Sequence, residues 1–182
     1  MIGHSIGAQT VMWFIENHYE HVEKAVMISG LNKPIKGINW LIKPIVSMSM
    51  PLIKFRRFAK LQSKELNLPN DMFEAYYQDS LLISGKTLTN VLISNLNFEF
   101  NGTSGTVSQN TLVIVGENEK KMMITSAEKT ANLLRSTSYY EFVSAGHGIP
   151  YEMPQQLNDL IDHFVLNNLI DFHSNGVKVI NL

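Results

Sequence analysis

The stretch Gly3-His4-Ser5-Ile6-Gly7 matches the pattern G-x-S-x-G, and it decides the predicted fold. In this pattern the serine lies on a sharp, strained turn between a strand and a helix, which exposes its hydroxyl and favours small residues on either side. The apolar stretch 8–18 follows directly and predicts a helix that is buried on most sides, near the centre of the fold. Only Met1 and Ile2 precede the pattern, and we interpret them as the last residues of the strand.

Three short apolar runs further along the chain predict strands of a parallel sheet that is covered on both faces. These runs are residues 24–29, 111–115 and 138–143. Apolar residues recur at helical spacing between the last two runs and again after the third, where Pro154 stands near a helix start. The alternation of strands and helices predicts an α/β fold with a parallel sheet.

The segment 31–110 breaks this alternation. It suggests several helices and ends in turn-forming residues over 101–110, so we predict a helical cap insertion with its linker. The core then consists of residues 1–30 and 111–173. Residues 174–182 are predicted to be a C-terminal tail, either frayed or added at a sheet edge.

Composition narrows the possible functions. The 182 residues are 45% hydrophobic, which suffices for one core, and a formal net charge of -1 argues against nucleic-acid binding. The absence of cysteine excludes disulfides, a cysteine nucleophile and thiolate metal sites. No apolar run reaches the roughly eighteen residues that a transmembrane helix needs, and we expect a cytoplasmic protein.

The candidate catalytic residues lie at the ends of the predicted strands. Ser5 is the candidate nucleophile, and the N–H of Ile6, at the start of the following helix, is the candidate oxyanion donor. His147 follows the third strand within Ala-Gly-His-Gly and is the candidate general base. The acid that orients it should precede it in the chain, and Gly-Glu-Asn-Glu after the second strand offers Glu119, with Glu117 as the alternative.

The other histidines are weaker candidates. His18, Glu20 and His21 could imitate part of a metal site, but no further ligand stands at a suitable spacing, so a solvated helix end is the preferred interpretation. We therefore predict neither a metal nor an organic cofactor.

From Gly3 to about Leu169 the chain resembles the α/β-hydrolase fold superfamily. The resemblance is carried by Gly-His-Ser-Ile-Gly, by the strand 112–116 with Glu119, and by Ala-Gly-His-Gly-Ile-Pro-Tyr-Glu-Met-Pro over 145–154. It implies that the triad acid stands three residues after the glycine that closes this strand, where Glu119 takes the place of the more usual Asp. It also implies a cap inserted after the strand that follows the elbow helix, where 31–110 lies.

The resemblance further implies several strands before the serine, and a loop among them that provides a second oxyanion donor. Nothing in this sequence can take that role, so we expect an N-terminally truncated chain that lacks the segment upstream of Ser5. In the cap, apolar residues such as Met48 could line an adaptable substrate pocket or simply pack the cap. Basic residues at 54, 56, 57, 60 and 64 could face an anionic lipid, an acidic substrate or solvent.

The expected function is a serine hydrolase that cleaves a carboxylic ester or similar acyl bond through Ser5, His147 and Glu119, with an acyl-enzyme intermediate. Its expected partner is a small-molecule substrate, an apolar acyl ester. Two alternatives stay open: a non-catalytic homologue that binds a ligand in the same pocket, and an inactive truncated fragment whose exposed strand edge invites aggregation.

Overall fold

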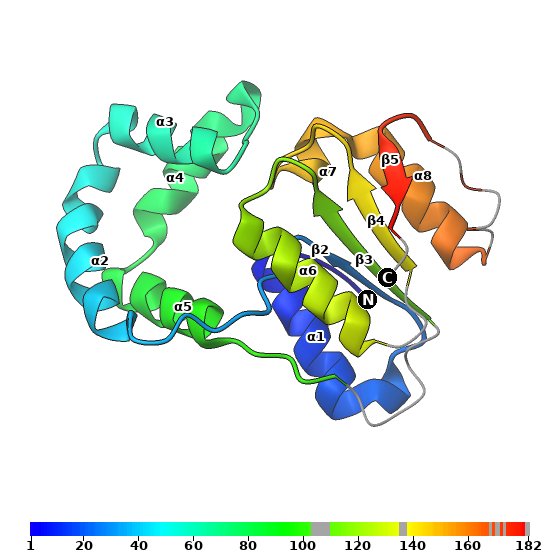
Figure 1. Ribbon diagram of the computed structural model, residues 1–182. Helices are drawn as coiled ribbons and strands as arrows, with labels where there is room; N and C mark the ends of the chain where they lie inside the picture. The colour runs from blue at the N-terminus through cyan, green and yellow to red at the C-terminus, as the bar shows by residue number, and fades with distance from the viewer. Residues whose placement is uncertain (103–109, 135–137, 168, 170–171, 173, 181–182) are drawn as a thin grey trace. The chain divides into compact units, whose positions relative to one another are not determined.

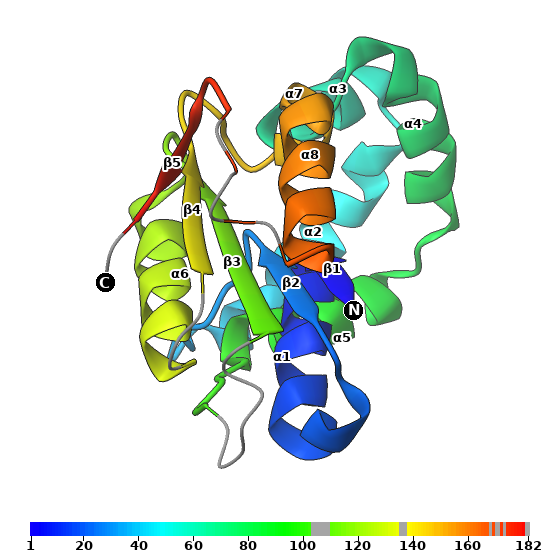
Figure 2. The same ribbon diagram turned by 90° about the vertical axis from the view of Figure 1, so that its right-hand side faces the viewer.

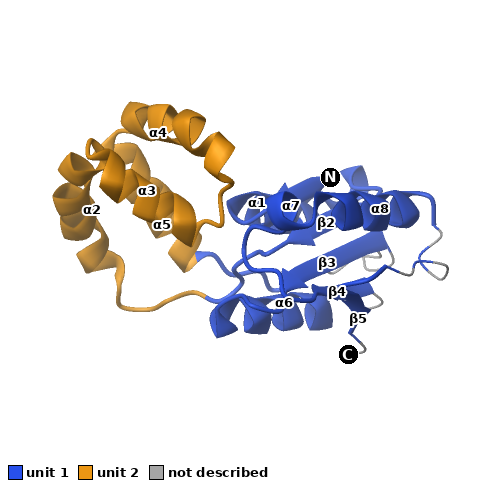
Figure 3. Ribbon diagram, turned by 90° about the horizontal axis from the view of Figure 1, so that it is seen from above, with its two compact units in different colours: residues 1–33, 98–182 blue, residues 34–97 orange. Residues whose placement is uncertain are grey.

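A computed structural model describes residues 1–102, 110–134, 138–167, 169, 172 and 174–180. The chain divides into two compact units, which Figure 3 colours separately. Unit 1 contains Met1–Lys33 and Phe98–Leu182, and unit 2 contains Pro34–Asn97.

Unit 1 is built on a five-stranded sheet whose strands follow one another in chain order. The first four strands are parallel, and the fifth is antiparallel to the fourth. The register places Gly3 beside Met27, Met27 beside Val113, and Val113 beside Tyr139. The strands are β1 (Ile2–His4), β2 (Ala25–Ile28), β3 (Thr111–Gly116), β4 (Ser138–Phe142) and β5 (Val177–Val179).

Helices cover both faces of this sheet (Figures 1 and 2). Successive strand residues point to opposite faces, so Met27 packs with helices α1 (Ile6–His18) and α6 (Lys121–Leu133), while Ile28 packs with α8 (Pro154–Val165). A short helix, α7 (Ile149–Glu152), precedes α8, and a 3-10 turn, η1 (Tyr19–His21), follows α1. The predicted α/β fold with a parallel sheet is confirmed.

The helix predicted over 8–18 is α1, which has one buried face within the described residues. α1 packs against β1 and β2 at one end of the sheet, and β1 is an edge strand within the described residues. One face of α1 is buried through Ala8, Met12 and Ile15, but Trp13 on another face is exposed. An apolar stretch shows that a helix can be buried without showing how many of its sides have neighbours.

Unit 2 is helical. It contains α2 (Asn39–Ile53), α3 (Arg56–Glu65), a 3-10 turn η2 (Asn70–Met72), α4 (Phe73–Leu82) and α5 (Gly85–Asn97). α2 packs against α5 and α3, and α3 packs against α4. Met48, named above as a possible pocket residue, is exposed, and so are the apolar side chains of Trp40, Leu52 and Phe55 in the same unit.

Unit 2 is narrower than the predicted insertion 31–110, because residues on either side of it belong to unit 1. The buried Asn32 links the segment before unit 2 to the segment after it. Its amide nitrogen donates to Thr130 Oγ1 at 3.0 Å, and its side-chain oxygen accepts the Phe100 N–H at 2.7 Å. Residues 103–109 of the predicted linker lie outside the described residues.

The C-terminal residues add a strand to the sheet. β5 pairs with β4, and two further backbone bonds extend the pairing, from Val143 N–H to Gly176 and from Ile180 N–H to Tyr139. Of the two alternatives for the C-terminal tail, residues 177–179 therefore adopt the second, a segment added at the sheet edge. Residues 181–182 lie outside the described residues. Among the helices that the structure describes, none combines the length and apolar character required to cross a bilayer.

Candidate active site

The turn between β1 and α1 has the strained backbone that the sequence pattern predicts. Ser5 has φ 56° and ψ -118°, which an L-residue rarely adopts and which costs about 1–3 kcal/mol. The conformation is held by hydrogen bonds from Ser5 N–H to the Ile28 carbonyl at 2.9 Å and from Ala8 N–H to the Ser5 carbonyl at 3.0 Å. The surrounding sheet and helix thus impose the strain that presents the serine side chain.

The two glycines of the pattern are not equivalent. A Cβ on Gly3 would overlap the carbonyl group of Gly7, so glycine is required where β1 passes beneath the start of α1. A Cβ on Gly7 would meet no atom within 4 Å among the described residues. Within the described residues, the small residues expected on either side of the serine thus have a steric cause at Gly3 and none at Gly7.

Three predicted residues form one chain of hydrogen bonds. Ser5 Oγ lies 3.0 Å from His147 Nε2, and His147 Nδ1 lies 2.9 Å from Glu119 Oε2. An ionised carboxylate only accepts hydrogen bonds, so Nδ1 carries the imidazole proton and Nε2 is left to accept the serine hydroxyl. The structure therefore brings Ser5, His147 and Glu119 together in the order that nucleophilic catalysis needs.

The carboxylate at the end of this chain is buried. The Glu119 side chain is 1% exposed, whereas that of His147 is 26% exposed. Glu119 Oε1, the oxygen that does not contact the imidazole, accepts hydrogen bonds from Ser29 Oγ at 2.5 Å and Gly116 N–H at 3.2 Å. Both carboxylate oxygens are thereby satisfied, which a buried charge requires.

Glu117, the alternative acid, makes different contacts. Its carboxylate accepts the Ser144 N–H at 2.8 Å and lies 3.4 Å from Lys178 Nζ. The bond from Ser144 N–H, followed by that from Lys178, lowers the pKa of Glu117 from its usual value. Glu117 thus anchors the backbone of the loop that carries His147, while Glu119 contacts the imidazole itself.

The histidine loop has further anchors that the sequence analysis did not identify. Asn118 Nδ2 donates to the Ser144 carbonyl at 3.0 Å, and Glu152 Oε2 accepts the Gly146 N–H at 3.0 Å. A Cβ on Gly116 would lie only 2.5 Å from the Ala145 carbonyl oxygen, so the β3 loop and the histidine loop approach each other closely. These contacts fix the position of the His147 backbone.

His4, the residue before the serine, also holds this loop. Its Nε2 donates to the His147 carbonyl at 2.8 Å, and the two imidazole rings are 5.0 Å apart. Burial, the largest effect, lowers the pKa of His4 and favours its neutral form. The only sequence signal for this role was its position beside Ser5, because the contact joins residues 143 apart.

The candidate oxyanion donor begins α1. Ile6 is the first residue of the helix, and its N–H has no hydrogen-bond partner among the residues that the structure describes. Free N–H groups and the helix dipole at such a position favour a negative oxygen. Ile6 N–H is therefore available to a negative oxygen, and its role as oxyanion donor stays a prediction.

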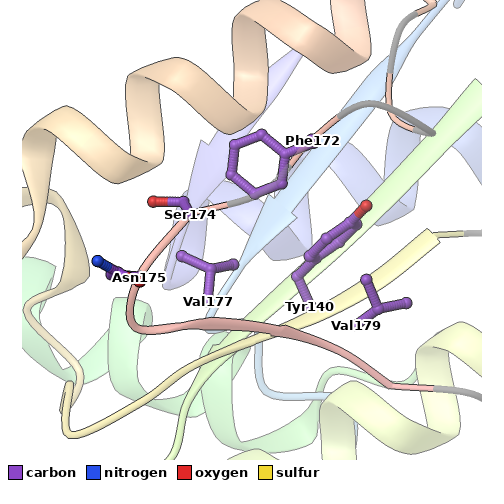
Figure 4. A pocket seen from close by; sticks show the side chains of 6 residues that line it. All are labelled: Tyr140, Phe172, Ser174, Asn175, Val177 and Val179. Atoms are coloured by element: carbon purple, nitrogen blue, oxygen red, sulfur yellow. The ribbon is translucent and has the colours of Figure 1, made fainter.

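The weaker candidates do not assemble into a site. His21 lies 3.5 Å from Glu20 at an exposed turn, and no group of three possible metal ligands comes together in the described part of the chain. A separate hollow of about 450 Å³ lies at β4 and β5 (Figure 4). It is lined by Tyr140, Phe172, Ser174, Asn175, Val177 and Val179, none of which belongs to the hydrogen-bond chain at Ser5.

Comparison with known proteins gives structural matches only. No protein-family model matches the sequence, and no curated protein matches it. The structure is similar to MenH from S. aureus, with a TM-score of 0.63 and 16% identity, and the match covers 92% of this chain and 67% of that one. It is also similar to an esterase from Exiguobacterium antarcticum, with a TM-score of 0.67 and 13% identity over 90% of this chain and 65% of that one.

A third match is the meta-cleavage product hydrolase CumD from Pseudomonas fluorescens, with a TM-score of 0.59 and 16% identity over 91% of this chain and 64% of that one. Identities this low establish the fold alone. The fold is the α/β-hydrolase fold, and the chain spans about two thirds of the length of these structures.

Proposed function

We propose that this protein is a serine hydrolase that cleaves a carboxylic ester or a similar acyl bond through an acyl-enzyme. The observation that carries the proposal is the hydrogen-bond chain from Ser5 Oγ through His147 to the buried carboxylate of Glu119. The fold supports it, because its solved examples include proteins described as an esterase and a meta-cleavage product hydrolase.

In the first step Ser5 Oγ attacks the carbonyl carbon of the substrate while His147 Nε2 takes the hydroxyl proton. Glu119 stabilises the imidazolium that forms, because its Oε2 already accepts the Nδ1 proton. The carbonyl oxygen becomes negative in the tetrahedral intermediate, and Ile6 N–H donates to it. The intermediate then expels the alcohol, which takes the proton from His147 Nε2 and leaves the acyl group on Ser5.

In the second step a water molecule gives a proton to His147 Nε2 and attacks the acyl carbon. The second tetrahedral intermediate collapses, Ser5 Oγ recovers the proton, and the carboxylic acid leaves. Nucleophile, base and acid are all side chains of this chain, and the reaction as written uses no metal or organic cofactor. The proposed substrate is a small molecule with an apolar acyl group.

Labelling with a fluorophosphonate tests the proposal, because such probes phosphonylate a serine that a neighbouring base activates. We expect the peptide containing Ser5 to carry the label and Ser5→Ala to lose it together with hydrolysis of an activated ester. Ser63→Ala is the matched control, since Ser63 is a buried serine in α3 whose hydroxyl bonds a backbone carbonyl. A folded protein in which Ser5 stays unlabelled contradicts the proposal and favours the ligand-binding alternative.

A further inference from the structure

Each of the four parallel strands is followed by a residue that takes part in the hydrogen-bond chain. Ser5 follows β1, Glu119 follows β3, and His147 follows β4. The residue after β2 is Ser29, whose hydroxyl donates to Glu119 Oε1 at 2.5 Å. The short distance is typical of a hydroxyl bound to an ionised carboxylate.

The backbone of Ser29 is unusual for a residue with a side chain. Ser29 is 1% exposed and has φ 53°, in the left-handed region that glycine adopts at lower cost. Its N–H donates to the Ile114 carbonyl at 2.9 Å, so the neighbouring strand holds it in place. A serine at this position accepts strain that a glycine would avoid, and its hydroxyl makes the one contact that a glycine could not.

The two oxygens of Glu119 have separate partners. Oε2 faces His147 Nδ1, and Oε1 faces Ser29 Oγ and Gly116 N–H. Without the serine hydroxyl, the buried Oε1 keeps only the longer bond, 3.2 Å, from Gly116 N–H. The carboxylate could then rotate away from the imidazole, and part of its charge would be left without a donor.

We propose that Ser29 is a positioning residue that holds the Glu119 carboxylate in the orientation His147 needs. The inference deepens the proposed function and rests on it for its effect on turnover. The Ser29 hydroxyl bonds Glu119 and makes no hydrogen bond to Ser5 or His147, so the proposed effect of the hydroxyl passes through Glu119. Loss of its hydroxyl therefore lowers kcat and leaves substrate binding, and with it KM, nearly unchanged.

Ser29→Gly is the decisive variant, because it removes the hydroxyl and relieves the backbone at the same time. We expect kcat to fall about tenfold, with KM within about twofold of its original value and with thermal stability retained. Ser29→Ala, which keeps the strain, should lose a similar factor in kcat. Asn67→Gly is the control, because Asn67 has the same positive φ of 53° but belongs to unit 2, outside the unit that contains Glu119.

A proton NMR signal tests the positioning independently of turnover. The His147 Nδ1 proton faces a carboxylate and should resonate far downfield of the amides, with His147→Gln identifying it. We expect Ser29→Gly to shift or broaden this signal and Asn67→Gly to leave it in place. An unchanged signal with unchanged kcat in Ser29→Gly overturns the inference. If the wild-type protein proves unreactive, a shifted signal still supports the positioning of Glu119 while the proposed function fails.

Discussion

Two paired carboxylates, one in each unit, differ in burial more than in contact distance. In unit 1 the Glu119 side chain is 1% exposed and lies 2.9 Å from His147 Nδ1. In unit 2 the Glu74 side chain is 57% exposed and lies 2.5 Å from Arg56. Sheet loops bury and orient the first pair, whereas solvent screens the second on a helix surface. Distance alone therefore does not show which carboxylate matters for chemistry.

The largest effect that this comparison predicts is on turnover. Glu119→Gln should lower kcat by about 10³-fold or more, because the amide can leave the imidazole in the wrong tautomer and cannot stabilise its charged form. Hydrolysis of an activated ester measures it. Glu74→Gln makes the same chemical change at the exposed pair and should leave kcat unchanged.

Glu117→Gln provides a second comparison within the same loop. Glu117 contacts the Ser144 backbone and not the imidazole, so its loss should cost about tenfold at most. A Glu117→Gln variant that loses more activity than Glu119→Gln would assign the acid to Glu117.

Replacing one glycine in each unit, Gly116 in unit 1 and Gly85 in unit 2, should have a smaller effect, on the free energy of unfolding. Gly116→Ala should lower the free energy of unfolding by about 1–3 kcal/mol, because its Cβ would lie 2.5 Å from a backbone carbonyl that cannot move without the histidine loop. In Gly85→Ala the nearest atom is Met50 Cγ at 3.3 Å, on a flexible side chain, and α5 gains a better helix former. Urea denaturation should find Gly85→Ala neutral or stabilising, and equal losses for both variants would contradict the contrast.

The sequence was sufficient to predict much of the fold and of the candidate site. Apolar runs that end in glycine or a polar residue predict parallel strands, and the structure places them in one sheet. Since parallel strands bring their carboxyl ends to one edge, a serine, a glutamate and a histidine at three such ends could be expected to meet. The order of these residues in the chain then distinguished their proposed roles.

The remaining contacts depend on how distant loops fold onto one another. His4 binds a carbonyl 143 residues away, and Ser29 binds a carboxylate 90 residues away. Neither residue type nor local spacing predicts such a contact, because a one-residue change in strand register would remove it. For β5 the sequence left two alternatives open, because Val177-Lys178-Val179 is too short a pattern to distinguish an edge strand from a frayed tail.

Replacing His4 should change the pH dependence of the free energy of unfolding, by less than Gly116→Ala changes that free energy. Burial lowers the pKa of His4 in the folded state, whereas the unfolded chain takes up the proton near pH 6.5. The unfolded state then binds more protons below that pH, so the free energy of unfolding falls as the pH drops from 7 to 5. His4→Gln should show a shallower decline in chemical denaturation across this range. A parallel decline in both proteins would show that His4 is not held neutral.

The smallest effect is expected at the exposed pair. Arg56 holds the pKa of Glu74 at about 2, well below its usual range, mainly through their hydrogen bond. A depressed pKa gives stability that is present above the ordinary carboxylate pKa and lost as the pH falls through the folded value. Solvent screening keeps it small, so Glu74→Gln should lower the thermal midpoint at pH 7 by less than about 2 °C. The difference should shrink further in 1 M salt, and a large, salt-independent difference would show that Glu74 resembles Glu119 after all.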